Sequence, residues 1–543
     1  MSRILRREVA FLPCLVLCLG PLVIGWATLT QAAPTQEPLA GMQYRTLPEL
    51  LQSIVTDPAL SGALVGAQVT RVQDGKTIFA YQNDLLINPA SVTKVFTTAA
   101  ALCLLHPDFR FKTEIYALNP PVNGQLMGPW FLRGTGDPFL VSERLQYMAA
   151  EVKALGIDQI QGALVLDDTY FDEQGDGPGW DQDHTARPYQ APMGALSLNF
   201  NSVAVLVFPT LAGKASRVDL FPGSAHFKLI NQVTTSDRTH FTLDSRSVNG
   251  KDQITVSGRI AMHHPGARSH CKVVNPSFYT GYSLLDAFKR QGIKVGDTVK
   301  RGPVPAGAEL IFSYQSLSLG ELVRKVNKLS QNFMAEQLWK TLGAEFLGPA
   351  GSWRKGERVM QAFLEEEVGI PPGAYVLSNG SGLNDVNRVT TSQVVALLRY
   401  VWNRFDVQSE FLSSLAIAGA DGTVINRFTH PMVARTIRVK TGTLENVRAM
   451  SGYAQSRGHE VFAFALLIQD FASPGAKVSH LIDRFAAALS RADGNRLVTE
   501  DFDISPLEST SKNQPLWPPA LAPGTEESLI PSGEKIKSSP ETP

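Results

Sequence analysis

A stretch that joins a serine, a lysine and an unbroken apolar run constrains this chain most. Residues 88–102 read NPASVTKVFTTAAAL and predict a helix that begins at or near Ser91. Ser91 and Lys94 are three residues apart, so their side chains share one helix face. A lysine sunk in an apolar helix start can have a pKa low enough to take the serine proton. Taken alone, the pattern is more typical of an N-cap serine with a solvated lysine one turn later.

Two further motifs lie in the second half of the chain and change this interpretation. Ser330-Gln331-Asn332 falls at a break between two helical runs. Lys440-Thr441-Gly442 closes a strand-like run and is followed by Thr443. The order S-x-x-K, S-x-N and K-T-G resembles the motif trio of penicillin-binding proteins and serine β-lactamases. Each tripeptide is weak evidence, but the three in this order and these settings predict one catalytic site.

The residue types predict the first half of an acyl transfer. Ser91 attacks a carbonyl carbon and forms an acyl-enzyme, and Lys94 accepts the hydroxyl proton. Ser330 and Lys440 can relay a proton to the leaving amine. Asn332 can hold the Lys94 side chain and a backbone amide of the substrate.

The K-T-G segment supplies the expected substrate-binding groups. Its strand offers an edge to which an extended peptide can add by main-chain hydrogen bonds. The hydroxyls of Thr441 and Thr443, with the Lys440 charge, suit a terminal carboxylate. Gly442 leaves room at the site because it has no side chain. We expect the oxyanion between the backbone N–H groups of Ser91 and Thr443.

The order of expected elements predicts an α/β (α+β) domain built from two sequence pieces. A hairpin at 66–72 and 77–81, with a turn at Asp74-Gly75, directly precedes the Ser91 helix. Similar texture returns after about residue 315. The expected helices are 47–55, 317–347, 352–368, 391–402 and 476–492, and the expected later strands are 436–440, 451–454 and 460–468. We therefore predict one domain from 45–117 and 315–497.

An insert separates the two pieces. Residues 118–314 contain short alternating runs divided by Gly, Pro, Asp and Asn, which predict a mainly β region with two nested subdomains. The runs are 161–166, 203–208, 228–233, 239–243 and 253–260. A helix is expected only at 145–155.

The N-terminal segment has the features of an export signal. A basic start, an apolar run at 9–29 and small residues at 30–33 predict a signal peptide at 1–33, cleaved after Ala32 or Ala33. The apolar run is also near spanning length, so an uncleaved anchor with peripheral membrane contact stays open. The Pro-, Ser- and Glu-rich residues 503–543 predict a disordered tail.

Charge and cysteine content narrow the classes of partner and cofactor. Lys plus Arg and Asp plus Glu number 50 each, which does not indicate a nucleic-acid binder. The ten histidines are scattered, and His263-His264 is expected in a solvated turn, so we predict no metal and no cofactor. Cys14 and Cys18 leave with the signal. Cys103 is expected as a buried thiol, with no bridge to Cys271.

With these motifs in place, the chain resembles one family in particular. It is similar to the D-alanyl-D-alanine carboxypeptidase/endopeptidases of the low-molecular-mass class C penicillin-binding proteins, serine peptidase family thirteen, over almost all of the mature chain up to about residue 495. The long insert between Ser91 and Ser330 is typical of that family and argues against a minimal β-lactamase. Supporting motifs are GTGDP at 134–138, LDDTYF at 166–171, GPGW at 177–180, LSLNFNS at 196–202, SGL at 381–383 and ADGT at 420–423.

The resemblance implies a function and a fold. It implies a periplasmic enzyme of the cell envelope that hydrolyses D-Ala-D-Ala bonds of peptidoglycan stem peptides, and often the cross-links between stems. It implies that β-lactam antibiotics acylate Ser91 as inhibitors. It implies a penicillin-binding-protein/serine β-lactamase-like transpeptidase domain with a large, mainly β insert. It further implies that Asp168, from the insert, helps to bind the amino end of the stem side chain.

Two positions depart from the family pattern. Asn379 stands where the family commonly has Asp, and Asp385 stands where it often has an Arg that holds a carboxylate of the stem's diamino acid. The nearest arginine is Arg388. These departures leave open a peptidoglycan-binding scaffold with little turnover. A β-lactamase or esterase of the same fold is a separate alternative. The sequence does not give the oligomeric state or the balance between carboxypeptidase and endopeptidase activity.

Overall fold

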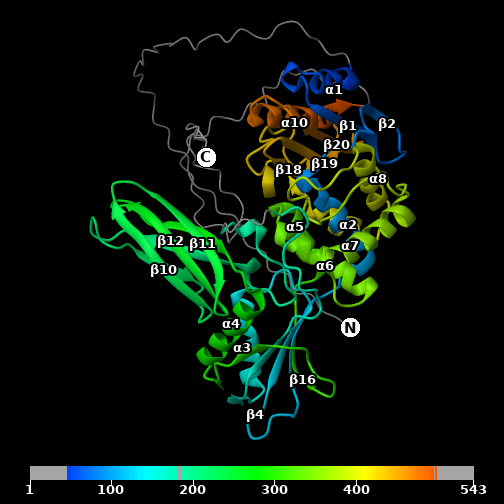
Figure 1. Cartoon of the computed structure of the whole chain (residues 1–543). Coiled ribbons are helices and arrows are strands. Elements are labelled where there is room, and N and C mark those ends of the chain that lie inside the picture. Colours follow the sequence, from blue (N-terminus) through cyan, green and yellow to red (C-terminus); the bar gives the residue numbers. More distant parts are fainter. Residues whose placement is uncertain (1–45, 181–185, 494–495, 498–543) are drawn as a thin grey trace, which may run out of the picture. The chain divides into compact units, whose positions relative to one another are not determined.

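The computed structural model describes residues 46–180, 186–493 and 496–497 (Figure 1). The predicted signal peptide at 1–33 and the predicted tail at 503–543 lie outside the described residues. Within the described part of the chain, no helix is both long and apolar enough to cross a membrane.

Both sequence pieces contribute to one six-stranded antiparallel sheet. The predicted hairpin is confirmed as β1 and β2, and β1 pairs along its whole length with β20 from the second piece. The sheet order is β17 (Ala416–Ile417), β18 (Ile437–Leu444), β19 (Val447–Gln455), β20 (Val461–Gln469), β1 (Leu64–Arg71) and β2 (Thr77–Tyr81).

Alternation along the strands gives this sheet two apolar faces. On β20, Phe462 and Phe464 belong to the core that also contains α1 (Leu47–Val55) and α10 (Gly475–Ser490), whereas Ala463 and Ala465 belong to the opposite core. The opposite core is made with the remaining helices of this domain, which are α2 (Thr93–Leu105), α5 (Leu319–Leu329), α6 (Asn332–Leu347), α7 (Trp353–Ala362), α8 (Thr391–Trp402) and α9 (Gln408–Ser414).

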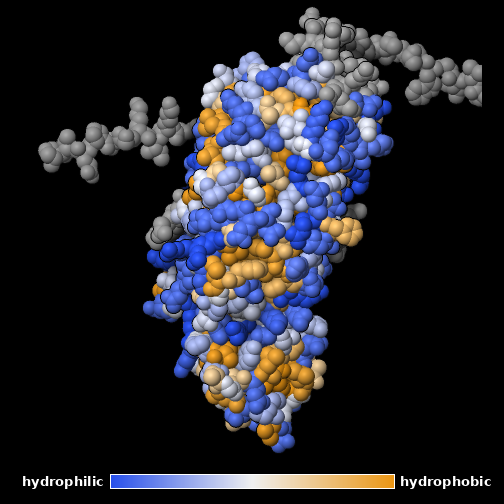
Figure 2. Space-filling view, turned by 90° about the vertical axis from the view of Figure 1, so that its right-hand side faces the viewer, coloured by the Kyte–Doolittle hydropathy of each residue, from blue (hydrophilic) through white to orange (hydrophobic). Residues whose placement is uncertain are grey.

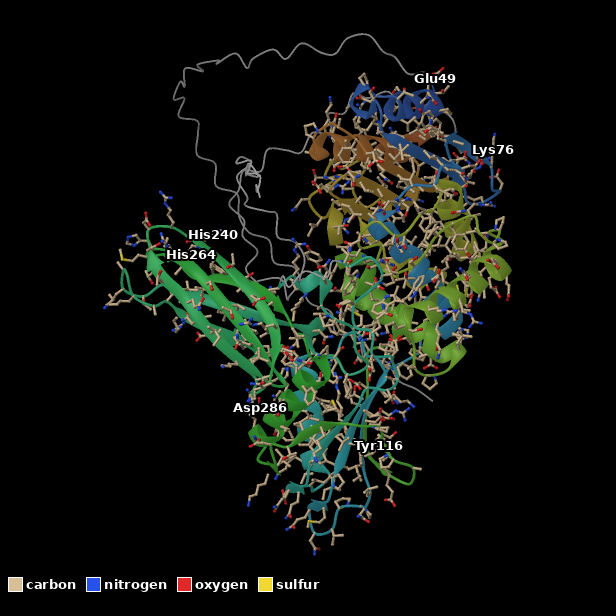
Figure 3. All side chains as sticks on the ribbon, in the orientation of Figure 1. Glu49, Lys76, Tyr116, His240, His264 and Asp286 are labelled. Carbon is tan, nitrogen blue, oxygen red and sulfur yellow. The ribbon has the colours of Figure 1, made fainter. Side chains whose placement is uncertain are left out.

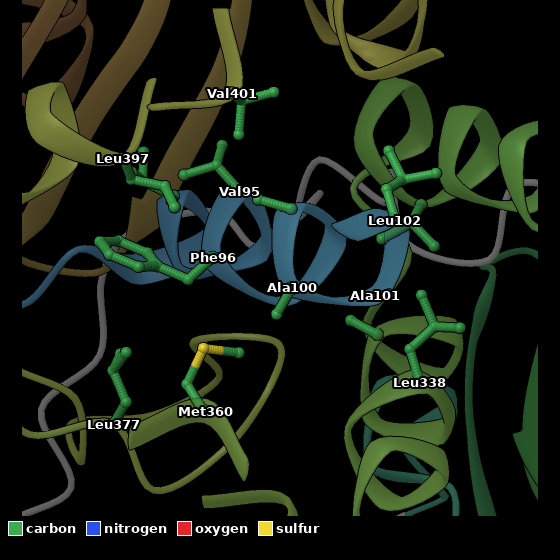
Figure 4. Close-up of a cluster of buried hydrophobic side chains, with 14 of the residues drawn as sticks. Val95, Phe96, Ala100, Ala101, Leu102, Leu338, Met360, Leu377, Leu397 and Val401 are labelled. Carbon is green, nitrogen blue, oxygen red and sulfur yellow. The ribbon is translucent and has the colours of Figure 1, made fainter. Parts of the chain in front are cut away.

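Helix α2 is enclosed within the opposite core. Every residue from Thr93 to Cys103 is buried, and a helix that is apolar on all sides belongs inside a protein. Figure 4 shows Val95 next to Leu397 and Val401 of α8, and Ala101 next to Leu338 of α6. The helix that follows Ser91 is therefore fixed from several directions. The buried thiol predicted at Cys103 is confirmed, and both described cysteines are free.

The insert contains a second sheet that takes in the end of the first sequence piece. Strand β3 falls before the predicted boundary at 117, yet it pairs with β5 and β16 of the insert. The sheet of the insert therefore begins at Lys112 and not after the predicted boundary at 117, because β3 pairs with strands of the insert. The sheet order is β15 (Val299–Arg301), β7 (Leu164–Asp167), β5 (Trp130–Gly134), β3 (Lys112–Ala117) and β16 (Glu309–Gln315), and a smaller sheet is formed by β14 (Lys294–Val295), β6 (Gln159–Gln161) and β4 (Gln125–Met127).

Two helices pack in the core of this second sheet. The first, α3 (Ser142–Ala154), matches the helix expected at 145–155. The second, α4 (Pro276–Arg290), was not predicted. Thr280 and Gly281 in its middle have low helix propensity. Pro276 at its first turn and the spacing of Leu284, Leu285 and Phe288 were the available signals.

A separate β region carries its own hydrophobic core. This core, made by residues such as Val205, Val256 and Ile260, is distinct from that of α3 and α4. The two cores support the predicted division into two nested subdomains, which stays a prediction. The strands form two sheets, β10 (Phe227–Ser236), β12 (Lys251–Ala261) and β11 (His240–Val248), and β13 (Ala267–Lys272), β8 (Ser202–Phe208) and β9 (Arg217–Phe221).

The surface mixes polar and apolar side chains. His263 and His264 lie in the turn between β12 and β13, as expected. Figure 3 shows His264 near His240, at one end of the sheet formed by β10, β12 and β11. The face in Figure 2 has hydrophobic side chains gathered in separate patches within a mostly hydrophilic surface. Scattered exposed hydrophobic residues are normal on protein surfaces, so they indicate no particular partner.

Candidate active site

Ser91 lies on a tight turn just before helix α2. The turn η2 spans Ala90–Val92 and α2 begins at Thr93, two residues later than Ser91. Ala90 has a φ of 45°, an uncommon conformation for a residue with a side chain. The buried Asn88 holds the turn, because its Oδ1 accepts the Ala90 N–H at 2.8 Å. This geometry fixes the backbone that presents the Ser91 hydroxyl.

Lys94 contacts two other predicted site residues and one backbone carbonyl. Its Nζ lies 2.9 Å from Ser91 Oγ and 2.7 Å from Asn332 Oδ1. It also donates to the carbonyl oxygen of Ser381 at 2.7 Å. The lysine is fully buried. Lys94 therefore contacts both Ser91 and Asn332, which were predicted to share its site.

The three partners of Lys94 fit a neutral amine. A neutral amine has two N–H donors and one lone pair. The two donors match the oxygens of Asn332 and Ser381, and the lone pair can then accept the Ser91 O–H. Burial lowers the pKa of Lys94 to about 7, although the charge of Glu336 opposes part of this shift. The amine form is thus available near neutral pH.

Ser330 and Lys440 form a second pair beside the first. Ser330 has a left-handed backbone conformation at the end of α5, φ 55° and ψ 38°, which confirms the predicted break between helices. Lys440 Nζ donates to Ser330 Oγ and to the Thr441 carbonyl, both at 2.8 Å. Burial, followed by the nearby charge of Lys94, lowers the pKa of Lys440 well below its ordinary value.

Strand β18 borders the Ser91 turn. A Cβ on Gly442 would lie 2.7 Å from the carbonyl oxygen of Pro89, so only glycine fits there. Strand β17 pairs with β18 only at Val439 and Arg438, and thus leaves the edge from 440 onward unpaired by β17. The exposed Thr443 lies on that edge segment, as the predicted role in substrate binding requires.

A turn at 379–383 closes the site from another side. Asn379, the departure from the family's Asp, is buried and accepts the Gly382 N–H at 2.9 Å through Oδ1. Its Nδ2 donates to the Leu383 carbonyl at 3.0 Å. The Asn379 amide therefore stabilises this turn at both ends.

Gly382→Ala is expected to destabilise the protein more than Gly373→Ala. Both glycines have a φ of 73°, so alanine at either position costs ~1–2 kcal/mol of backbone strain. A Cβ on Gly382 would lie 1.8 Å from the Ala90 carbonyl oxygen, whereas nothing lies within 4 Å of one on Gly373. We expect an additional loss of ~1–3 kcal/mol for Gly382→Ala, measured by urea unfolding. Equal losses for the two variants would contradict this close contact.

The insert reaches the site through one loop. Asn379 Nδ2 donates to the Pro178 carbonyl at 3.4 Å, and Asn384 donates to the Gly179 carbonyl. A Cβ on Gly179 would lie 2.3 Å from Val386. The GPGW segment at 177–180 thus packs directly on the turn that contacts Lys94.

The structure does not bring Asp168 into this cluster. Its carboxylate accepts from Ser277 of α4 and lies 3.5 Å from the guanidinium of Arg301 on β15. Both partners belong to the insert, so the described contacts give no support to its role in substrate binding.

Asp385 and Arg388 form an ion pair near the Ser91 turn. Arg388 NH1 lies 2.7 Å from Asp385 Oδ1, which also accepts from Asn88 Nδ2 at 2.8 Å. Arg388, first among its partners, and Asn88 hold the pKa of Asp385 below its ordinary value, although burial opposes them. Arg388, the nearest arginine in sequence to the expected position, is therefore already paired with a carboxylate.

Sequence reasoning missed several residues around the predicted set, among them Ser381, which contacts Lys94, Thr423, which contacts Thr441, and Glu336, whose charge acts on Lys94. Thr423 Oγ1 lies 2.8 Å from Thr441 Oγ1, although the ADGT segment had been noted only as a family motif. Glu336 lies fully buried on α6. Its signal was a carboxylate four residues after Asn332, on the same helix face and within an apolar run.

Comparisons with known proteins agree with this geometry. Residues 47–489 match the D-Ala-D-Ala carboxypeptidase 3 (S13) family. A D-alanyl-D-alanine carboxypeptidase of Actinomadura sp. (strain R39) is 32% identical over 462 residues, which cover 82% of this chain and 85% of that protein. The D-alanyl-D-alanine carboxypeptidase DacB of Haemophilus influenzae is 26% identical over 427 residues, 78% of this chain and 88% of that protein.

A solved structure shows the same fold. The crystal structure of penicillin binding protein 4 (dacB) from Haemophilus influenzae superposes with a TM-score of 0.69 at 23% identity, and it covers 81% of this chain and 97% of that one. The predicted fold class, an α/β penicillin-binding-protein-like domain with a β-rich insert, is confirmed by this likeness.

Proposed function

The chain belongs to the D-Ala-D-Ala carboxypeptidase 3 (S13) family, and we propose that it performs this family's serine peptidase chemistry at Ser91. Its substrates are D-alanyl-D-alanine bonds in the stem peptides of peptidoglycan. The main observation behind this assignment is the 2.9 Å contact between Lys94 Nζ and Ser91 Oγ. The Lys94 side chain that makes this contact is fully buried.

Acylation begins with the amine form of Lys94. The Lys94 lone pair takes the Ser91 proton while Oγ attacks the carbonyl carbon of the D-Ala-D-Ala bond. The carbonyl oxygen becomes negatively charged, and we assign its stabilisation to the N–H groups of Ser91 and Thr443. Asn332 and the Ser381 carbonyl keep the Lys94 nitrogen aligned throughout.

Release of the first product needs a proton on the leaving amine. Lys440 and Ser330, 2.8 Å apart, can relay the proton that Lys94 accepted toward that nitrogen, which returns Lys94 to the amine form. The C–N bond then breaks, terminal D-alanine leaves, and the acyl group stays on Ser91 Oγ. Water later attacks the ester carbonyl carbon while Lys94 takes a proton from it. Lys94 then gives this proton to Ser91 Oγ as the ester C–O bond breaks, and the shortened stem peptide leaves as a carboxylic acid. Thr441, Thr443 and the Lys440 side chain are assigned to the terminal carboxylate, and the edge of β18 that β17 leaves unpaired to the peptide backbone.

The acylation rate is expected to rise with pH around neutrality. Burial lowers the pKa of Lys94 to about 7, and only the deprotonated amine can accept the Ser91 proton. Acylation should therefore be slow in acid and level off above that pKa. Rates of labelling by a fluorescent penicillin, measured from about pH 5 to about pH 9, check this. Thermal unfolding at each pH is the control, and a flat profile in folded protein would contradict the assignment of the base.

We assign the location and partners from the same chemistry. A predicted signal peptide at 1–33 and a peptidoglycan substrate favour export to the periplasm or cell envelope. β-Lactams are expected to act as acylating inhibitors of Ser91. In support, the Haemophilus influenzae penicillin binding protein 4, which has the same fold, has been crystallised as a complex with a β-lactam. Peripheral membrane contact would require that the apolar segment stays uncleaved.

One assay tests the function and its alternatives. Purified protein is incubated with peptidoglycan digests that contain pentapeptide stems and cross-linked dimers, and the products are separated. Loss of terminal D-alanine supports the carboxypeptidase, and conversion of dimers to monomers adds endopeptidase activity. Unchanged digests would favour a scaffold. Rapid repeated hydrolysis of a penicillin, in place of a long-lived acyl-enzyme, would favour a β-lactamase.

A further inference from the structure

Helix α6 places a carboxylate in the interior of the protein, next to the proposed site. The Glu336 side chain is fully buried, where an ionised carboxylate is costly unless donors surround it. Three donors are present. Trp353 Nε1 and the Gly380 N–H donate to Oε2 at 2.8 and 3.0 Å, and the Ser381 N–H donates to Oε1 at 2.9 Å.

Two of these donors belong to the turn that touches Lys94. Glu336 binds the backbone of residues 380 and 381 from one side, and Thr97 of α2 donates to the Gly380 carbonyl at 2.7 Å from the other. A Cβ on Gly380 would lie 2.8 Å from the Ala335 carbonyl, so the turn fits tightly on α6. The Ser381 N–H and carbonyl thus link Glu336 to Lys94.

We propose that Glu336 is a positioning residue for acylation, whose carboxylate fixes the 380–381 turn so that the Ser381 carbonyl holds Lys94 in line with Ser91. The proposal rests on the proposed function, since it assigns a role within the same site. Glu336 does not contact Ser91, so its effect passes through the turn and through its charge.

The charge of Glu336 also acts on Lys94. Burial, the larger effect, lowers the pKa of Lys94, and the Glu336 charge raises it. Lys440 of β18 is another titratable group beside Lys94, and its pKa is lowered by burial and then by Lys94. Lys340, one helical turn after Glu336 on α6, also feels the Glu336 charge and is paired with Asp172 of the insert at 2.7 Å. Removal of the Glu336 charge should therefore lower the pKa of Lys94 further.

Glu336→Gln and Glu336→Asp separate the two contributions. In Glu336→Gln the charge is lost and the amide cannot accept all three N–H groups, so we expect acylation to be ~10–100-fold slower. We also expect the fall of the acylation rate on the acid side of the pH profile, the acid limb, to move to lower pH. In Glu336→Asp the charge remains but the carboxylate retracts by one methylene. We expect a slower plateau with the acid limb near its original pH.

The experiment compares four full-length proteins. Labelling rates with a fluorescent penicillin are measured across pH for wild type, the two Glu336 variants and Glu345→Gln, with thermal unfolding of each. Glu345 lies on the same helix and bonds Tyr170 of the insert, so its variant removes a carboxylate away from Lys94. It should label at the wild-type rate with the wild-type pH dependence.

Each outcome gives a decision. If Glu336→Gln slows labelling and lowers the pH of the acid limb, the proposal is supported. If both variants lose rate with no difference in their acid limbs, Glu336 has only a structural role and the proposal is overturned. If Glu336→Gln does not fold, a folded Glu336→Asp that labels at the wild-type rate still overturns it. Absence of labelling in wild type would instead refute the proposed function.

Discussion

Ser91→Ala is expected to abolish covalent penicillin labelling and D-alanine release while the protein remains folded. The change removes only the Oγ atom, the nucleophile that forms the acyl ester on which all later proposed steps depend. Lys94 keeps its contacts with Asn332 and the Ser381 carbonyl, 2.7 Å each, so the site should retain its geometry.

The matched control for this change is Ser413→Ala. Ser413 is exposed at the end of α9, where its hydroxyl donates to the Glu410 carbonyl. Labelling should be lost in Ser91→Ala and unchanged in Ser413→Ala, measured by fluorescence after denaturing electrophoresis. A label that survives in Ser91→Ala would refute Ser91 as the nucleophile.

Lys94→Met is expected to slow acylation by ~10²–10⁴-fold, because it removes the proposed base and leaves the nucleophile in place. Methionine has a similar length and suits a fully buried position. The Asn332 and Ser381 oxygens would lose a donor, so we also expect a loss of ~1–3 kcal/mol in the free energy of unfolding. The residual rate should no longer show the rise around pH 7.

Lys340→Met controls for the loss of a buried ammonium. Lys340 is also fully buried, and it pairs with Asp172 at 2.7 Å and donates to the Gln174 carbonyl at 2.8 Å. This variant should lose stability but keep the pH-dependent acylation. Rates from stopped-flow labelling and free energies from urea unfolding separate the two effects. If Lys94→Met acylates as fast as Lys340→Met, Lys94 is not the base.

Local sequence rules were sufficient for most of the elements. The hairpin at β1 and β2 follows from alternation around Asp74-Gly75, and the break at Ser330 follows from two helical runs that meet there. The spacing of Ser91 and Lys94 allowed their side chains to lie on the same side, and only the later motifs indicated that the two form a pair. These are short-range properties, and the sequence contains them in full.

Long-range contacts were accessible only through the family resemblance, or not at all. The motif order grouped Ser91, Asn332 and Lys440, but it gave no contact for Glu336, whose partners at 353, 380 and 381 are distant in sequence. The family resemblance implied that Asp168 binds substrate, whereas the structure places its carboxylate against Ser277 and Arg301 of the insert.

The sequence by itself therefore predicted the chemistry that we propose: a serine nucleophile, a lysine base and the motifs that serve them. Only the tertiary structure decided which groups set the state of that lysine. Whether Lys94 is an amine or an ammonium depends on complete burial, on the oxygens of Asn332 and Ser381 and on the charge of Glu336. Burial and charge proximity are properties of how distant segments pack, and no pattern of neighbouring residues encodes them.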